Sequence, residues 1–387
     1  MKIKDMLQEM VKRDSSDIYI TAELPPMFRT EGVTEPWGDT KLSPEDTIAL
    51  ANEVMSEKQR AEFENTREMN LAIFEPDLGR FRVNIFYQRG NVGMVLRQIK
   101  IDIKSIDDLK LPSTLKDIIM TKRGLVLMVG GTGSGKSTSL AAMIDHRNST
   151  SSGHIISIED PIEFVHNHKK SVITQREVGF DTISFADALK NTLRQAPDVI
   201  LIGEIRDIET MESAITFAET GHLCLGTLHA NNANQAIERV INFFPAERHQ
   251  QIYLLLSLNL RSIISQRLVP TVDGKRAAAI EILLDTPRVK DLILKQEIGT
   301  LKEAMQEGVQ EGMQTFDQCL YNFYKAGTIS YENAIANADS ANDLRLRIKM
   351  DSAGKNGEKT EGEAKGEGEN DDKKEPAFKI KKEDPYA

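Results

Sequence analysis

The segment GGTGSGKST, which runs from Gly130 to Thr138, has the residue types and spacing that hold a phosphate group. Its glycines let successive backbone N–H groups turn inward around phosphate oxygens, and the following helix adds the positive end of its dipole. The apolar run GLVLMV precedes the segment, and the helical pattern SLAAMIDHR follows it. This order of strand, glycine-rich loop and helix is that of a P-loop. The expected nucleotide contacts in the loop are Gly130, Gly131, Thr132, Gly133, Ser134, Gly135, Lys136, Ser137 and Thr138.

Lys136 and Ser137 are expected to have separate roles in this loop. The Lys136 ammonium should reach the β- and γ-phosphates, and the Ser137 hydroxyl should ligate Mg²⁺. Glu204 stands just past a second apolar strand, PDVILIG, where a carboxylate can act on Mg²⁺ and on the attacking water. The alternative for Glu204 is an ordinary carboxylate at a strand end. Because the chain has no NKxD element, which guanine specificity usually needs, the predicted nucleotide is ATP.

A further acidic segment, HIISIEDPIEF, places Glu163 after a turn that Pro161 favours. Open α/β sheets bind their ligands at the carboxyl ends of the strands. A carboxylate at that edge can orient or deprotonate a water molecule for attack on the γ-phosphate. Glu163 is therefore a candidate catalytic residue, and a solvated acidic turn is the alternative.

Two histidines, His222 and His229, lie seven positions apart in the apolar segment GHLCLGTLHA. On one continuous strand an odd offset points two side chains to opposite faces, which disfavours a shared metal ion. Beside a P-loop, His229 beyond the strand is expected to face the nucleotide, while His222 lies where the strand begins. Core positions for both histidines are the alternative.

Composition limits the classes of protein to consider. The chain has 387 residues, 40% of them hydrophobic, and a net charge of −10, so it can form two or three domains and lacks a basic footprint for nucleic acid. Its two cysteines, Cys224 and Cys319, are far apart, which argues against a structural zinc site or a disulfide framework. No apolar run approaches the ~20 residues of a membrane span, and the N-terminus lacks the apolar core of a signal peptide. We therefore expect a cytoplasmic protein.

The first part of the chain predicts a small α+β domain over residues 1–100. Apolar residues recur at helical spacing over residues 1–13, and Ser43-Pro44 has the form of a helix start. Residues 69–99 alternate in the manner of strands, with arginines on the face opposite to the apolar side chains. A polar linker is predicted over residues 101–118.

From Gly124 the sequence alternates apolar strands with amphipathic helices, the pattern of a mostly parallel sheet covered on both faces. This α/β core is predicted over residues 119–285. After about Pro245 the pattern is helical, apart from the strand-like run AAAIEILL, and residues 286–350 are predicted to be helices. Residues 351–387 carry mixed charges and few large apolar side chains, so a disordered tail is expected there.

Four segments follow one another along the chain: GGTGSGKST, IEDPIEF, DVILIGEIRDIET and GHLCLGTLHANNA. In order and spacing they resemble the Walker A, Asp box, Walker B and His box of the secretion and type IV pilus ATPases, and the resemblance covers about residues 1–350. The chain carries no tetracysteine zinc site, so it resembles the retraction branch of PilT and PilU. Residues 286–297, TPRVKDLILKQE, depart from the AIRNLIRE element of the PilT type, whereas residues 311–349 and the charged tail resemble the PilU type.

The resemblance implies a fold and a set of roles. The first domain would be PAS-like and the second a RecA-like P-loop ATPase domain, with nucleotide between them. Glu163 would be the catalytic base or the acid that orients water, and Glu204 would act on Mg²⁺ and water. His229 would contact the γ-phosphate or its coordination network, and His222 would help to couple that site to a neighbouring subunit.

Arginines of the first domain would reach the phosphates in this family, and Arg82 and Arg97 are the candidates here. Cationic groups suit the charge on a transferring phosphoryl group. Arg80 is a weaker candidate, and Arg206 is expected to serve a structural purpose beside Glu204. Solvated arginines on a half-exposed sheet are the alternative.

The implied function is that of a homohexameric motor subunit that hydrolyses ATP to power or assist type IV pilus retraction in twitching motility. Its expected partners are a second retraction ATPase of the PilT type and the inner-membrane platform protein, and it would reach the membrane only through partners, at the pilus base. One alternative is an accessory ATP-binding subunit with little motor output of its own. A related secretion or assembly ATPase is another, while the acidic balance disfavours a DNA-translocating enzyme.

Overall fold

The computed structural model describes residues 2–99 and 102–357, with side chains as far as Asp351. Its contacts divide the chain into a first unit that ends at Asp339 and a second that begins at Ser340. None of the helices in the described residues combines the length and the apolar character that crossing a bilayer requires.

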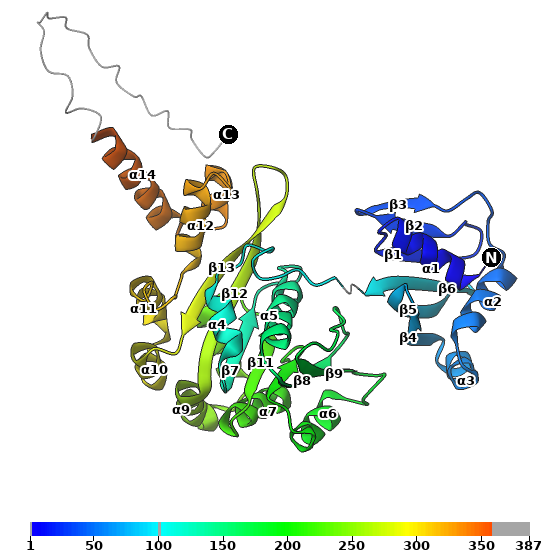
Figure 1. The fold of residues 1–387 in the computed structure, drawn as a ribbon, viewed down its shortest axis with the longest axis horizontal. Helices are drawn as coiled ribbons and strands as arrows, with labels where there is room; N and C mark the ends of the chain where they lie inside the picture. Colours follow the sequence, from blue (N-terminus) through cyan, green and yellow to red (C-terminus); the bar gives the residue numbers. More distant parts are fainter. Residues whose placement is uncertain (1, 100–101, 358–387) are drawn as a thin grey trace, which may run out of the picture. The chain divides into compact units, whose positions relative to one another are not determined.

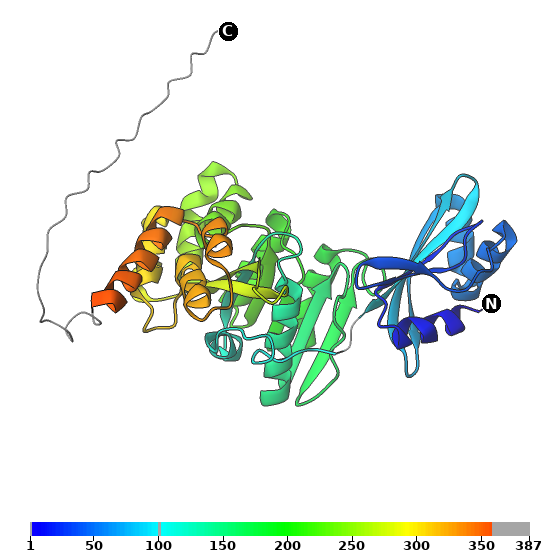
Figure 2. The same ribbon diagram turned by 90° about the horizontal axis from the view of Figure 1, so that it is seen from above.

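The N-terminal part of the first unit is built on an antiparallel six-stranded sheet with helices beside it (Figure 2). Its strand order is β3-β2-β1-β6-β5-β4. Three helices contribute apolar side chains to the single core cluster of this domain. The strands are β1 (Asp17–Ile20), β2 (Met27–Thr30), β3 (Val33–Pro36), β4 (Glu68–Glu75), β5 (Gly79–Gln88) and β6 (Asn91–Ile99), and the helices are α1 (Ile3–Lys12), α2 (Pro44–Val54) and α3 (Glu57–Thr66).

Local sequence explains these elements. Helix α1 buries its apolar stripe, as its spacing predicted. Helix α2 begins at a capping box in which the Ser43 hydroxyl accepts from the Asp46 N–H and the Asp46 carboxylate accepts from the Ser43 N–H. In β5, Phe81, Val83 and Ile85 are fully buried while the intervening residues are partly exposed, so the predicted one-faced sheet is confirmed.

The second domain of this unit contains a seven-stranded sheet with the order β13-β12-β7-β11-β10-β8-β9 (Figure 1). Its pairs are parallel except for β12 with β13. The strands are β7 (Gly124–Val129), β8 (Gly153–Glu159), β9 (Ser171–Glu177), β10 (Val199–Ile202), β11 (Leu223–Leu228), β12 (Leu260–Pro270) and β13 (Arg276–Leu284). The helices are α4 (Thr114–Met120), α5 (Lys136–Thr150), α6 (Phe185–Thr192), α7 (Ile208–Glu219), α8 (Ala233–Asn242), α9 (His249–Asn259), α10 (Pro287–Leu294), α11 (Leu301–Glu307), α12 (Phe316–Lys325) and α13 (Tyr331–Ala336).

Helices cover both faces of this sheet. Along β7, Leu125, Leu127 and Val129 belong to the core cluster formed with α7 to α11, whereas Val126 and Met128 belong to the cluster formed with α4 and α5. A strand buried on both faces is apolar at every position, which is why GLVLMV shows no alternation. The α/β fold class predicted from this pattern is confirmed.

Several element predictions need correction. Helix α4 starts inside the expected linker, because Leu115, Ile118 and Ile119 form a buried helical stripe. Strand β12 falls where only helices were expected. The strand pattern was missed because polar residues interrupt its apolar run, and the pairing of β12 with β7 and β13 decides its conformation. Strand β9 was also missed. Helix α14 (Ala341–Gly357) of the second unit continues beyond residue 350, and the rest of the predicted tail lies outside the described residues.

Candidate nucleotide-binding site

The segment predicted to be a P-loop connects β7 to α5, and α5 begins at Lys136. Gly135 has φ +85°, and a Cβ there would lie 2.8 Å from Nε2 of Gln266. A Cβ on Gly130 would lie 2.5 Å from the Gln266 carbonyl oxygen. Glycine is therefore required at both positions by the close approach of β12 as well as by the backbone conformation.

Gln266 of β12 holds this loop in place. Its Nε2 donates to the Ser134 carbonyl oxygen at 2.8 Å, and its Oε1 accepts from the Ser139 hydroxyl at 2.7 Å. The Gln266 side chain is buried at 3% exposure. One amide group thus joins the loop and the first turn of α5 to the neighbouring strand.

A cavity of about 460 Å³ lies at the loop and is lined by all the residues from Thr132 to Thr138, together with Glu163, Glu204 and His229. The Lys136 ammonium donates to the carbonyl oxygens of Gly130 and Gly131, at 2.8 and 3.0 Å. Burial lowers the pKa of Lys136, and the charges of Glu204 and Glu163 act in the opposite direction. The structure therefore brings the predicted lysine and both predicted glutamates to one cavity.

Glu204 lies after β10, and its carboxylate makes two contacts. One oxygen is 3.1 Å from Nε2 of His229, and the other accepts from the Arg206 guanidinium at 2.7 Å. Burial raises the pKa of Glu204, but the hydrogen bond and charge of Arg206, helped by His229 and Lys136, lower it overall. Glu204 is thus held in its charged form, and Arg206 has the supporting place expected for it.

The acidic segment after β8 forms another wall of the cavity. Glu163 lines the cavity and its side chain is exposed, so a water molecule can reach its carboxylate. Glu159 is partly buried and also lines the cavity, and its carboxylate accepts from Ser157 at 2.5 Å and from Gln175 at 3.2 Å. Burial raises the pKa of Glu159, and its hydrogen bonds with Ser157 and Gln175 act in the opposite direction. Both glutamates line the cavity, and Glu163 is the more exposed of the two.

The oxygen donors in this cavity fit a magnesium ion bound with a nucleotide. The Ser137 hydroxyl and the Glu204 carboxylate both line it, and Mg²⁺ prefers oxygen ligands shared with substrate phosphates. Such an ion would neutralise charge on the β- and γ-phosphates.

The two histidines lie at opposite ends of β11. His229 follows the strand and lines the cavity, whereas His222 precedes it. Nδ1 of His222 contacts the Thr220 hydroxyl at 3.1 Å and the Phe217 carbonyl oxygen at 3.3 Å, at the end of α7. A whole strand thus separates His222 from the cavity, in agreement with its expected place at the start of the strand. A role for His222 toward a neighbouring subunit stays a prediction.

The arginines of the first domain have different surroundings. Arg82 of β5 stands directly opposite Arg97 of β6. Arg97 donates to the Asp17 carboxylate at 2.7 Å, so it is held within its own sheet. Arg80 pairs with Glu177 of β9 at 3.3 Å. None of these three arginines lines the cavity described above, and their approach to phosphate stays a prediction.

Some functional residues escaped the sequence analysis. Gln266 was missed, although a glutamine between serine and arginine inside a buried strand was a signal. His166 and Arg276 also line the cavity. Burial lowers the pKa of His166 to about 4, so this histidine is neutral near pH 7.

A family model described as "Type II/IV secretion system protein" matches residues 1–357. The chain belongs to this secretion-protein family. It is 58% identical over 353 residues to the type IV pilus ATPase PilU of Pseudomonas aeruginosa, covering 91% of this chain and 92% of that protein. It is 43% identical over 334 residues to PilT, a pilus retraction ATPase of the same organism, covering 86% of this chain and 97% of that protein.

A solved structure supports the same relationship. The crystal structure of the pilus retraction motor PilT with bound ADP matches with a TM-score of 0.84 and 44% identity, covering 89% of this chain and 99% of that chain. The resemblance to the PilT and PilU branch, the RecA-like ATPase fold and the enzyme class, a P-loop ATPase, are thereby confirmed. The individual site residues and the domain boundaries at 100, 118, 285 and 350 stay predictions.

Proposed function

We propose that this protein is a motor subunit that hydrolyses ATP to drive or assist type IV pilus retraction. The observation that carries the proposal is the convergence of Lys136, Glu163, Glu204 and His229 on the cavity formed by the P-loop. Those four side chains lie in four different connections that follow the carboxyl ends of neighbouring strands, with Lys136 at the start of α5. An open α/β sheet binds its ligands at that edge.

The groups divide the work of phosphoryl transfer. The loop N–H groups and Lys136 bind the phosphates of ATP. Glu163 orients the attacking water, because it is exposed in the cavity. Glu204 holds His229 through the 3.1 Å contact, so that a γ-phosphate reaching His229 also changes the surroundings of Glu204. Ser137 and Glu204 would hold Mg²⁺, which would supply charge neutralisation at the phosphates.

Closure of the first domain on the nucleotide would turn hydrolysis into movement. We propose that Arg82 and Arg97 approach the phosphates in that closed state, within a homohexameric ring. The ring would act on an inner-membrane platform protein alongside a retraction ATPase of the PilT type. It would work at the inner face of the cytoplasmic membrane, at the pilus base.

The full chain tests this proposal in two assays, ATP turnover and pilus retraction. Lys136→Ala should lose both ATP binding and turnover, whereas Glu204→Gln should bind ATP and lower kcat by about 100-fold or more. Lys302→Met, which removes an ion pair with Asp317 away from the cavity, serves as the control and should remain active. Undiminished turnover in Lys136→Ala would refute the ATPase mechanism.

Retraction in cells that lack the PilT-type ATPase separates a motor from an accessory subunit. Retraction there would establish independent motor output. ATP turnover without retraction in those cells, restored by the second ATPase, would establish the accessory function.

A further inference from the structure

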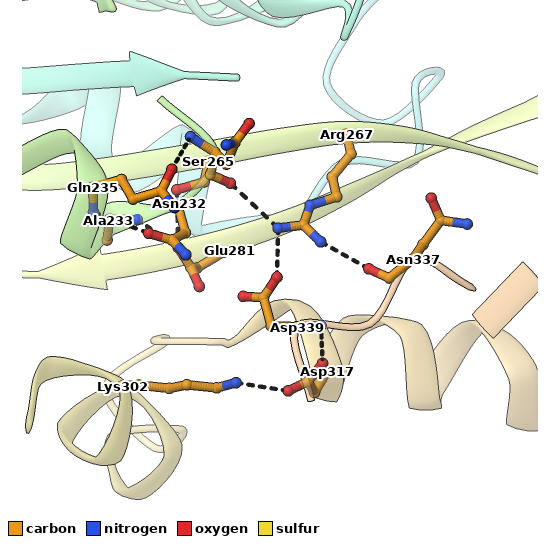
Figure 3. A network of polar contacts seen from close by, with 11 residues as sticks. Asn232, Ala233, Gln235, Ser265, Arg267, Glu281, Lys302, Asp317, Asn337 and Asp339 are labelled. Atoms are coloured by element: carbon orange, nitrogen blue, oxygen red, sulfur yellow. Dashed lines mark hydrogen bonds and ion pairs between the residues drawn. The ribbon is translucent and has the colours of Figure 1, made fainter. Parts of the chain in front are cut away.

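Polar side chains gather on the face of β12 and β13 beneath the start of α8 (Figure 3). Glu281 of β13 stands opposite Ser265 of β12, and both are buried, at 1% and 0% exposure. A single oxygen of Glu281 accepts from the Ser265 hydroxyl at 2.9 Å and from the Ala233 N–H at 2.8 Å. Ala233 is the first residue of α8, so Glu281 satisfies an N–H that the helix leaves free. A buried carboxylate thus fixes where α8 begins.

Arg267 extends from the same face of β12 and joins two other segments. Its guanidinium donates to the Asn231 carbonyl oxygen at 3.3 Å, just before α8. It also donates to the Asn337 carbonyl oxygen at 2.7 Å and to the Asp339 carboxylate at 2.6 Å. Its charge lies 3.7 Å from the centre of the Phe316 ring. Figure 3 shows Arg267 directed at Asp339 and Asn337, so one side chain ties the start of α8 to the end of the first unit.

A second layer holds Asp339 in turn. The Asp317 carboxylate of α12 accepts from the Asp339 N–H at 2.8 Å and pairs with Lys302 of α11 at 2.8 Å. The polar network therefore runs from the start of α8 to the C-terminal helices of the first unit (Figure 3).

The segment between β11 and α8 consists of residues 229–232, and His229 is its first residue. His229 contacts Glu204 at one end, and the contacts of Arg267 and Glu281 fix the other end. Gly131 of the P-loop lines one hollow with His229 and Asn231. It lines another with Arg267 and residues 336–338. The network thus lies where the P-loop, the His229 segment and the C-terminal part of the unit meet.

We propose that Arg267 and Glu281 are positioning residues for His229, and that Arg267 makes the position of His229 depend on the segment 337–339. The inference rests on the proposed ATP hydrolysis. Neither residue lines the cavity that holds Lys136, Glu163, Glu204 and His229, so each acts through the backbone of residues 229–233. Small displacements of a catalytic group are costly, since about 1 Å can lower a rate by about 100-fold.

The contact of Glu281 does not require a full negative charge. Burial raises the pKa of Glu281 to about 7, the Ala233 N–H lowers it, and Asp339 raises it further. Both protonation states keep an oxygen that accepts from Ala233. An amide in the same place should therefore preserve the positioning, which makes Glu281→Gln the conservative variant.

The test compares full-length variants for kcat, KM for ATP, and unfolding temperature. Glu281→Leu and Arg267→Lys, the second of which keeps the charge but loses the fork, should lower kcat by about 10- to 100-fold while KM changes by about twofold or less. Glu281→Gln should stay within about threefold of the wild-type kcat. Lys302→Met, which breaks an ion pair of the same network without touching the His229 segment, is the matched control and should keep kcat within about threefold.

A double-mutant cycle with His229→Ala decides the route of the effect. If Glu281 and Arg267 act through His229, neither substitution should lower kcat further in the His229→Ala background. Asp339→Ala should behave as Arg267→Lys does, lowering kcat in the wild-type background alone. If Glu281→Leu or Arg267→Lys lowers kcat by the same factor in the His229→Ala background as in the wild type, the inference is overturned. An unchanged kcat in folded Arg267→Lys would overturn it as well. Absence of turnover in the wild type would instead refute the proposed function.

Discussion

Replacing Gln266 by methionine should loosen the P-loop without filling or emptying the space beside it. Methionine is unbranched and of similar length, so it can occupy the buried position, but it offers neither hydrogen bond. The Ser134 carbonyl oxygen would lose a donor at 2.8 Å and the Ser139 hydroxyl an acceptor at 2.7 Å. The Ser139 hydroxyl can turn to a carbonyl of its own helix, whereas the Ser134 carbonyl cannot move without the loop.

The cost follows from these two groups. A buried polar group left without its partner costs about 1–3 kcal/mol. Because the Ser139 hydroxyl can find another acceptor, the cost comes chiefly from the unpaired Ser134 carbonyl. Gln266→Met should therefore lower the free energy of unfolding by about 1–3 kcal/mol. Each kcal/mol lowers the unfolding temperature of a domain of this size by about 2–4 °C. Because the loop is the phosphate cradle, ATP affinity should fall with stability.

Thermal unfolding and ATP titration of the full-length protein measure both effects. Ser262→Ala provides a control on the same strand, because the buried Ser262 hydroxyl has no hydrogen-bond partner among the described residues. Removing that hydroxyl should leave stability and ATP affinity unchanged or slightly improved. Wild-type stability and ATP affinity in Gln266→Met would refute the argument that Gln266 holds the loop.

Three further predictions follow from packing, burial and charge. Gly226→Ala would place a Cβ 2.5 Å from Cδ1 of Ile205, so it should lower the free energy of unfolding by about 1–3 kcal/mol. Ile205→Val removes that Cδ1 atom and should relieve part of the loss in urea titrations. If the effects of the two substitutions on the free energy of unfolding simply add, the predicted clash is contradicted. Burial lowers the pKa of His166 to about 4, below its ordinary 6.5, so between these values the unfolded chain binds a proton that the folded protein does not. The free energy of unfolding should therefore fall by up to about 1.4 kcal/mol per pH unit as the pH is lowered from 6.5 to 4. Urea titrations across that range should show a shallower pH dependence in His166→Phe, and an unchanged slope would count against a neutral histidine in the folded protein. Arg82→Ala should lower kcat more than Arg97→Ala, because Arg97 is held by Asp17, and steady-state turnover showing the reverse order would contradict it.

Much of the architecture could be predicted because its signals are local. The stripe of α1, the capping box at Ser43 and the alternation of β5 each depend on residues within a few positions of one another. Strand β12 could not be predicted in this way, because its conformation depends on pairing with β13 and with β7, which is far away in the sequence. Long-range pairing overrides a weak local pattern.

The site shows the same division. Spacing placed Lys136 and Ser137 in a phosphate loop, and strand ends brought Glu163, Glu204 and His229 to the same edge. The sequence also placed His222 at the start of its strand, but only the structure shows its contacts with Thr220 and Phe217 at the end of α7.

The sequence by itself determined the nucleotide-binding loop, the order of the acidic and histidine segments, and the α/β class, because backbone conformation and burial over short stretches follow from residue type. Only the tertiary structure decided that Glu204 holds His229, that Gln266 anchors the P-loop, and that Arg267 and Glu281 fix the start of α8. Those contacts join elements far apart in the chain. Their geometry exists only once the sheet has set which strands are neighbours and which face each side chain occupies.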